Sequence, residues 1–126
     1  MESSPRNTVL VVDDDKVQRE LLKRVLGLFQ LNVQLAPTGA DALQMLKESV
    51  PDLVLLDIQM PGMDGYETLR QIQNLLQQDA PPVVGLSGSL ERGDEGEKGF
   101  SDYIVKPFNI SELRDLLRPF VDLPPS

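Results

Sequence analysis

Carboxylates stand at two points of the sequence where an apolar run ends. Asp13 and Asp14 follow the run Thr8 to Val12, and Asp57 follows the run 53–56. Like charges that meet in a partly desolvated cleft repel one another strongly, and a bound cation removes that conflict. Oxygen ligands suit a hard ion, so Mg²⁺ is the expected cation and Mn²⁺ could substitute.

A lysine and a hydroxyl follow two later apolar runs. Ser87 ends VVGLS, and Lys106 follows DYIV directly before a proline. A carboxylate is a competent nucleophile toward phosphorus if something neutralises the transferring group. We expect Lys106 to supply fixed positive charge and Ser87 a hydrogen bond to the phosphoryl oxygens. For Asp15 we expect capping of the next helix rather than ligation.

These residues are predicted to be positioned by strands and helices that alternate along the chain. The expected strands are Thr8–Val12, the stretch around Val33 and Leu35, Asp52–Leu56, VVGLSG and YIVKP. The first helix is predicted to bury the stripe Val17, Leu21, Val25 and Leu28.

The later helices carry capping signals and apolar spacing. Thr38 and Asp41 are typical of a capping box that opens a helix through about Glu48, and Ser111 is the expected N-cap of the last helix. Two helices are recognised by their apolar residues: Leu69, Ile72, Leu75 and Leu76 in one, and Leu113, Leu116, Leu117 and Phe120 in the other. Alternation of this kind predicts an α/β doubly wound parallel sheet, with the functional crevice at the carboxyl ends of its strands.

Composition limits the remaining possibilities. The 126 residues are 40% hydrophobic, which predicts one domain over residues 1–126 with a core of about 7–121. The net charge of −8 argues against direct nucleic-acid binding. The chain has no Cys and no His, so thiolate chemistry is excluded and no phosphohistidine can form on it. Its apolar runs are too short to span a membrane, and we expect a cytoplasmic protein without membrane insertion.

The stretches VLVVDDD, LVLLDIQMPGMDG, VVGLSG and DYIVKPF, in that order, resemble the response-regulator receiver family over nearly the whole chain. The resemblance implies a flavodoxin-like five-stranded sheet of order 2-1-3-4-5. It also implies that Asp57 is the phosphoacceptor, with Asp13, Asp14 and the main-chain carbonyl of Gln59 as further cation ligands. Ser87 and Lys106 match the family's switch hydroxyl and lysine, and Tyr103 its aromatic switch residue.

The same resemblance implies a role in two-component signalling or a phosphorelay. A histidine kinase or histidine phosphotransfer protein would be the donor, and phosphorylation would switch contacts with an output protein that the sequence does not identify. The only reactions expected are the chain's own phosphorylation and dephosphorylation, whether it acts alone or as a module of a hybrid kinase or larger regulator. The segment SLERGDEGEKG lacks a helical apolar stripe, so the family's fourth helix is expected to be shortened or absent.

Two other classes share parts of this pattern. A phosphatase with an aspartate nucleophile normally needs a second acid two residues later, where this chain has Gln59. A flavodoxin-like cofactor binder must cradle phosphate in its first loop, where Asp13 to Asp15 would repel it. Both classes are therefore disfavoured.

Overall fold

The computed structural model describes residues 6–58, 65–88 and 99–124. Gln59 and the segment 89–98, for which a shortened or absent helix was expected, lie outside the described residues. The elements, in chain order, are β1 (Thr8–Val12), α1 (Lys16–Leu28), β2 (Asn32–Ala36), α2 (Gly39–Glu48), β3 (Leu53–Asp57), α3 (Gly65–Leu76), a short 3-10 helix (Gln77–Asp79), β4 (Val83–Ser87), β5 (Asp102–Val105) and α4 (Ile110–Leu117). Among these residues, no helix combines the length and apolar content needed to cross a membrane.

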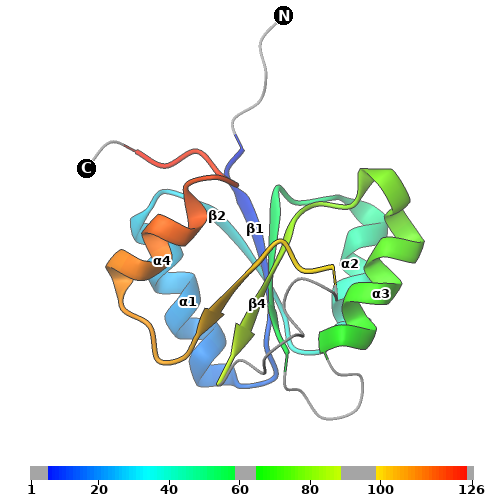
Figure 1. The fold of residues 1–126 in the computed structure, drawn as a ribbon, viewed down its shortest axis with the longest axis horizontal. Helices are drawn as coiled ribbons and strands as arrows, with labels where there is room; N and C mark the ends of the chain where they lie inside the picture. The colour runs from blue at the N-terminus through cyan, green and yellow to red at the C-terminus, as the bar shows by residue number, and fades with distance from the viewer. Residues whose placement is uncertain (1–5, 59–64, 89–98, 125–126) are drawn as a thin grey trace, which may run out of the picture.

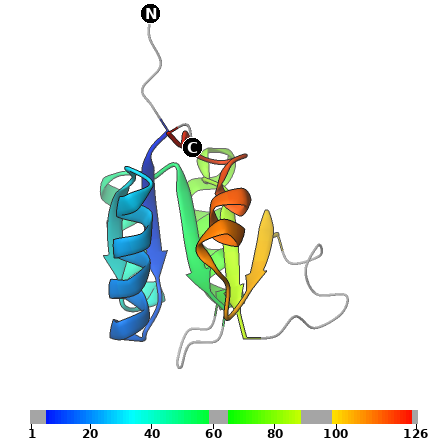
Figure 2. The same cartoon turned by 90° about the vertical axis from the view of Figure 1, so that its left-hand side faces the viewer.

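The strands form one parallel sheet of order β2-β1-β3-β4-β5, which confirms the predicted doubly wound fold. Helices α1 and α4 cover one face and α2 and α3 the other (Figure 1). The strands run in the same direction, so all their carboxyl ends lie at one end of the sheet, opposite the chain termini (Figure 2). The termini and the predicted crevice are therefore at opposite ends of the molecule.

Alternation along the strands supplies a separate core to each face. On β1, Val9 and Val11 pack in the cluster under α1 and α4, whereas Leu10 and Val12 pack in the cluster under α2 and α3. All of these side chains are fully buried. Because burial of each is worth roughly 1.5–3 kcal/mol, the two clusters hold the central strands rigidly enough to fix the residues that follow them.

The prediction for α1 chose the wrong apolar face. Val17 is 76% exposed, Leu21 53% and Leu28 70%. Leu22 and Leu26 point into the core instead, and of the predicted stripe only Val25, which is partly buried, packs against it. Two interleaved stripes of this helix both have helical spacing, and only packing against the sheet decides between them. The exposed stripe is therefore available on the outer surface.

The predicted N-cap of α2 is confirmed, and the predicted N-cap of α4 is wrong. Thr38 Oγ1 accepts the N–H of Asp41 at 3.0 Å and begins α2 as expected. The last helix, α4, is capped by Asn109 rather than Ser111: Asn109 Oδ1 accepts the N–H of Glu112 at 2.7 Å, and Glu112 Oε1 accepts the N–H of Asn109 at 2.9 Å. This reciprocal pair satisfies two donors that a serine inside the first turn cannot reach.

The two ends of the chain are tied together at the amino end of the sheet. The main-chain N–H of Arg6 donates to Asp122 Oδ2 at 2.9 Å and its guanidinium to Oδ1 at 3.1 Å, while the N–H of Asp122 donates to the Arg6 carbonyl at 2.8 Å. The hydrogen bond from the Arg6 main chain, followed by that from its guanidinium, lowers the pKa of Asp122. Both carboxylate oxygens and the main-chain N–H of Asp122 thus have a close partner on Arg6.

Candidate functional site

Three carboxylates meet at the carboxyl end of the sheet. Asp57 is the last residue of β3, and Asp13 follows β1, the neighbouring strand. Asp13, Asp14 and Asp57 each place a carboxylate oxygen within 4.8 Å of the other two. Parallel pairing of β1 with β3 brings these strand ends together, so the structure gathers the acids as the sequence predicts.

The three acids differ in their surroundings. Asp13 is 1% and Asp57 5% exposed, whereas Asp14 lies open to solvent. Asp13 Oδ1 accepts the N–H of Asp15 at 3.0 Å, but among the described residues Asp13 Oδ2 has no hydrogen-bond partner. A buried carboxylate oxygen without a partner carries a desolvation penalty, which a ligand at this point would offset.

Lys106 lies between the two buried acids. Its Nζ is 3.7 Å from Asp13 Oδ2 and 3.6 Å from Asp57 Oδ2. Both distances exceed those of good charge-assisted hydrogen bonds, so the ammonium acts on the carboxylates mainly through its charge. The main chain fixes its position, because the Lys106 N–H donates to the Ser87 carbonyl at 2.7 Å.

These residues fit a hard divalent cation. One ammonium cannot neutralise three carboxylates, and Asp13 Oδ2, which has no hydrogen bond among the described residues, faces Lys106 Nζ at 3.7 Å. An all-oxygen donor set of this kind suits Mg²⁺ or Mn²⁺. Gln59, the expected main-chain ligand, lies outside the described residues.

Asp15 caps α1, as expected from the sequence. Its carboxylate accepts the N–H of Val17 at 2.9 Å and that of Gln18 at 3.4 Å. These bonds satisfy N–H groups that every helix leaves unpaired in its first turn. Asp15 therefore anchors the start of the helix beside the site.

Ser87 and Tyr103 lie on the neighbouring strands. Ser87 ends β4 and is 3% exposed, one position beyond the residue that pairs with Asp57. Tyr103 on β5 is half-buried, pairs with Gly85, and its ring centroid is 5.1 Å from that of Phe100. A Cβ on Gly85 would lie 3.0 Å from Tyr103 Cδ1, so the glycine leaves room for this ring over the strand.

Sequence reasoning missed one residue that contacts the acidic loop. Arg19, on α1, donates through Nη1 to the main-chain carbonyl of Asp13 at 2.8 Å. No motif marks this arginine, because amphipathic helices commonly carry arginine on their polar side. Only its place on the second turn of a helix that begins at the acids hints at the contact.

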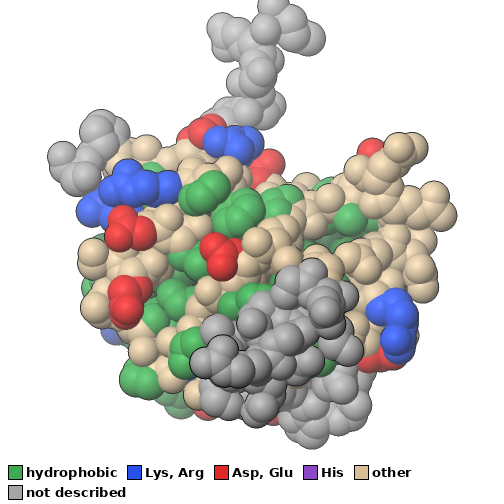
Figure 3. Space-filling model, viewed as in Figure 1, with side chains coloured by type: hydrophobic (Ala, Val, Ile, Leu, Met, Phe, Trp, Pro, Cys, Tyr) green, Lys and Arg blue, Asp and Glu red, His purple; other side chains and the backbone are tan. Residues whose placement is uncertain are grey.

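An open apolar groove of about 870 Å³ adjoins the site. It runs between α1 and the segment from Lys106 to Leu113, and its lining includes Leu21, Val25 and Ile110. Apolar side chains reach the surface on the α1 and α4 side of the molecule (Figure 3). Because Lys106 belongs to both, the groove opens directly beside the carboxylates.

Comparison with known proteins points to one family. The profile of the family described as "Response regulator receiver domain" matches residues 9–118. The chain is 38% identical over 113 residues to the response regulator MprA of Mycobacterium sp. (strain KMS), which covers 87% of this chain and 48% of that protein. The chain thus spans about half the length of the curated relatives it matches.

Solved structures give the same result. The response regulator protein TrrA from Thermotoga maritima, in complex with Mg(2+)-BeF, has a TM-score of 0.82 and 34% identity, over 91% of this chain and 99% of that one. The receiver domain of Ssk1 from Saccharomyces cerevisiae, solved with the histidine phosphotransfer signaling protein Ypd1, has a TM-score of 0.82 and 26% identity, over 95% and 92%. Both likenesses extend over nearly the whole of each chain.

Proposed function

The chain belongs to the response-regulator receiver family, and from that premise we propose that Asp57 is the residue that accepts the phosphoryl group. Receiver domains of response regulators are phosphoacceptors. In this chain the donor would be a phosphohistidine on a histidine kinase or histidine phosphotransfer protein. Phosphorylation would then switch contacts with an output protein.

The proposed reaction is an in-line transfer to a carboxylate oxygen. An Asp57 oxygen forms a bond to phosphorus while the bond from phosphorus to the donor's imidazole nitrogen breaks, and the donor histidine keeps the electron pair. Lys106 balances charge on the phosphoryl oxygens, and the Ser87 hydroxyl donates a hydrogen bond to one of them. Asp13, Asp14, Asp57 and Gln59 would hold Mg²⁺, which supplies further charge neutralisation, and Mn²⁺ could substitute.

The placement of Lys106 against Asp57 and Asp13 supports this proposal more than any other feature. Two buried carboxylates share one ammonium at 3.6 Å and 3.7 Å, and one oxygen has no hydrogen bond among the described residues. A structural ion pair is expected to shorten these contacts and satisfy each oxygen. A site that receives a cation and a phosphoryl group is expected instead to keep Asp13 Oδ2 available to the ligand.

Intact-mass analysis with acetyl phosphate tests the assignment. The wild-type chain with Mg²⁺ should gain the mass of one phosphoryl group, and the gain should disappear on chelation or in Asp57→Asn. Asp52→Asn is a matched control, because Asp52 directly precedes β3, at the end opposite Asp57, and accepts the N–H of Thr8 at 3.0 Å. Uptake that survives Asp57→Asn would remove Asp57 from the role of nucleophile.

Other features of the function are proposed from the sequence and the family. Residues 1–126 would form a single receiver domain with a core of about 7–121, acting alone or as a module of a larger protein. Its only catalysis would be its own phosphorylation and dephosphorylation. We place it in the cytoplasm, without direct nucleic-acid binding or membrane insertion. Its output partner would be another protein.

The donor is proposed to dock in the groove beside α1. Leu21 and Ile110 are more than half exposed there, so their burial would favour a partner with an apolar stripe. The polar side of α1 carries the basic residues Lys16, Arg19, Lys23 and Arg24 in a chain of net charge −8. This combination fits an acidic helical surface, such as that of a histidine phosphotransfer protein, and Lys106 leads from the groove to Asp57.

Replacing Leu21 with Asp separates docking from chemistry. Transfer from a phosphorylated histidine phosphotransfer protein should slow by roughly ten-fold or more, because a charge enters the apolar contact. Labelling by acetyl phosphate should stay unchanged. Leu75→Asp is the control, since Leu75 is an exposed leucine on α3. Equal transfer rates from the protein donor to both variants would place docking elsewhere.

A further inference from the structure

The loop that carries the acids is held from three sides. The Asp13 N–H donates to the Ala36 carbonyl at 3.1 Å, and Asp13 Oδ1 accepts the N–H of Asp15 at 3.0 Å. The third contact comes from Arg19, whose Nη1 donates to the Asp13 carbonyl at 2.8 Å. Asp13 thus has its main-chain donor, its main-chain acceptor and one carboxylate oxygen engaged, and Oδ2 is the atom that has no hydrogen bond within the described part of the chain.

Arg19 also connects this loop to the start of α1. Its own N–H donates to the Asp15 carbonyl at 3.0 Å, while the Asp15 side chain caps the same helix. The side chain of Arg19 then reaches back past the cap to Asp13. Helix α1 is therefore linked, through the side chain of the half-buried residue Arg19, to the main chain of a proposed ligand.

We infer that Arg19 is a positioning residue for the cation site: it holds the Asp13 main chain so that Oδ2 faces Asp14, Asp57 and Lys106. The inference rests on the proposed function, because it assumes that these acids bind a divalent cation. Arg19 binds neither the cation nor the phosphoryl group. Its effect passes through the Asp13 carbonyl, as outer partners of metal ligands commonly act.

Charge and positioning predict opposite effects of removing the guanidinium. A positive charge close to the acids repels a cation, so its loss alone would strengthen Mg²⁺ binding. Loss of the hydrogen bond to Asp13 would free the loop and weaken binding. The sign of the change in Mg²⁺ affinity therefore distinguishes a positioning residue from a nearby charge.

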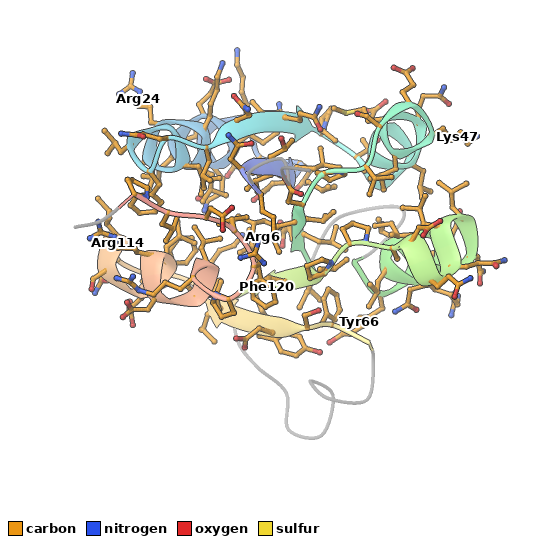
Figure 4. All side chains as sticks on the ribbon, turned by 90° about the horizontal axis from the view of Figure 1, so that it is seen from above. Arg6, Arg24, Lys47, Tyr66, Arg114 and Phe120 are labelled. Atoms are coloured by element: carbon orange, nitrogen blue, oxygen red, sulfur yellow. The ribbon has the colours of Figure 1, made fainter. Side chains whose placement is uncertain are left out.

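Calorimetric titration of MgCl₂ into Arg19→Gln and Arg24→Gln measures that sign. Arg24 is an exposed residue of the same helix, and its side chain points away from the molecule (Figure 4). We expect Arg19→Gln to weaken Mg²⁺ binding by roughly ten-fold. Arg24→Gln, which removes the same charge, should leave the affinity unchanged or slightly higher. Binding by Arg19→Gln as tight as that of wild type, or tighter, would overturn the inference.

The variant Arg19→Lys provides a second test of the same inference. Arg19→Lys keeps the charge and a single donor but loses the planar fork, so its Mg²⁺ affinity should lie between those of wild type and Arg19→Gln. If Arg19→Gln does not fold, the Mg²⁺ affinity of Arg19→Lys tests the inference alone, and an affinity equal to that of wild type overturns it. Failure of the wild-type chain itself to bind Mg²⁺ would instead overturn the proposed cation site.

Discussion

Acidic and basic side chains meet at both ends of the sheet, but the two groups differ in burial and in hydrogen bonding. At the amino end, Arg6 and Asp122 are exposed and exchange hydrogen bonds of 2.8–3.1 Å. At the carboxyl end, Lys106 lies 3.6–3.7 Å from Asp57 and Asp13, which are buried. Arg6 and Asp122 each donate to and accept from the other, whereas the carboxyl-end cluster has excess negative charge and an Asp13 oxygen with no hydrogen bond among the described residues.

This difference separates a contact that holds the fold from one that prepares a reaction. A satisfied surface pair adds a little stability, and removing one partner costs a little. Buried like charges oppose folding until a ligand arrives, so removing one can stabilise the unliganded protein. Substitutions at the two ends are therefore expected to change the unfolding free energy of the unliganded protein in opposite directions and by different amounts.

Asp13→Asn should produce the largest effect, with Mg²⁺ affinity falling while the stability of the metal-free protein rises. Mg²⁺ affinity should fall at least ten-fold, because a buried ligand loses its charge. The unfolding free energy of the metal-free protein should rise by about 1 kcal/mol as repulsion from Asp57 is relieved. Calorimetric titration and urea unfolding with a chelator present measure the two quantities. Lower stability together with unchanged Mg²⁺ affinity would show that Asp13 serves the fold alone.

Asp14→Ala should weaken Mg²⁺ binding several-fold, which is a smaller effect because Asp14 is exposed. Relief of repulsion should offset part of any stability loss. Asp115→Ala, at an exposed acid on α4, is the matched control for the change in net charge. Equal affinities in wild type and Asp14→Ala would remove Asp14 from the site.

Beryllofluoride, a phosphoryl mimic, should alter hydrogen exchange at the carboxyl end and leave the amino end unchanged. The proposed switch draws the Ser87 hydroxyl toward Asp57 and lets the Tyr103 ring turn, so peptides between residues 87 and 103 should change several-fold in exchange rate. The amide of Asp122, which donates to Arg6, is the internal control. Unchanged protection across 87–103 with the mimic bound would point to output through another face.

Asp122→Asn should have the smallest effect, a slight fall in the urea midpoint with no change in Mg²⁺ affinity. Hydrogen bonds from Arg6 hold the pKa of Asp122 below its ordinary value of 3.8. The folded state therefore prefers the carboxylate, and the stabilisation present above the unfolded pKa is lost as the pH falls through the folded one. Between neutral pH and acid, the variant should lose less stability than wild type. Identical pH profiles would show that the pair contributes nothing.

The sheet could be predicted from the sequence because each strand is marked by a short local run or alternation of apolar residues. The apolar face of α1 could not be predicted in the same way, since the stripes Leu22–Leu26 and Val17–Leu21 have the same spacing and only the sheet selects one. The cap at Asn109 was missed because the serine two residues later is an equally good capping type.

In the candidate site, the sequence predicted the residues at strand ends but not the residue that contacts them from a helix. Asp13, Asp57 and Lys106 each end or follow a strand, so the parallel topology alone brings them to one place. Arg19 contacts Asp13 from a helix, and the direction of a long side chain does not follow from spacing. The pairing of Arg6 with Asp122 joins residues 116 positions apart and carries no local signal.

Reductive trapping of the acyl phosphate tests the central claim most directly. Borohydride reduces a phosphorylated aspartate to homoserine, and peptide mass spectrometry then identifies the position. After treatment with acetyl phosphate and Mg²⁺, homoserine should appear at residue 57 alone, and chelation should abolish it. Homoserine at Asp13 or Asp14, or its formation at residue 57 without a divalent cation, would contradict the proposed roles of the acids at this end of the sheet.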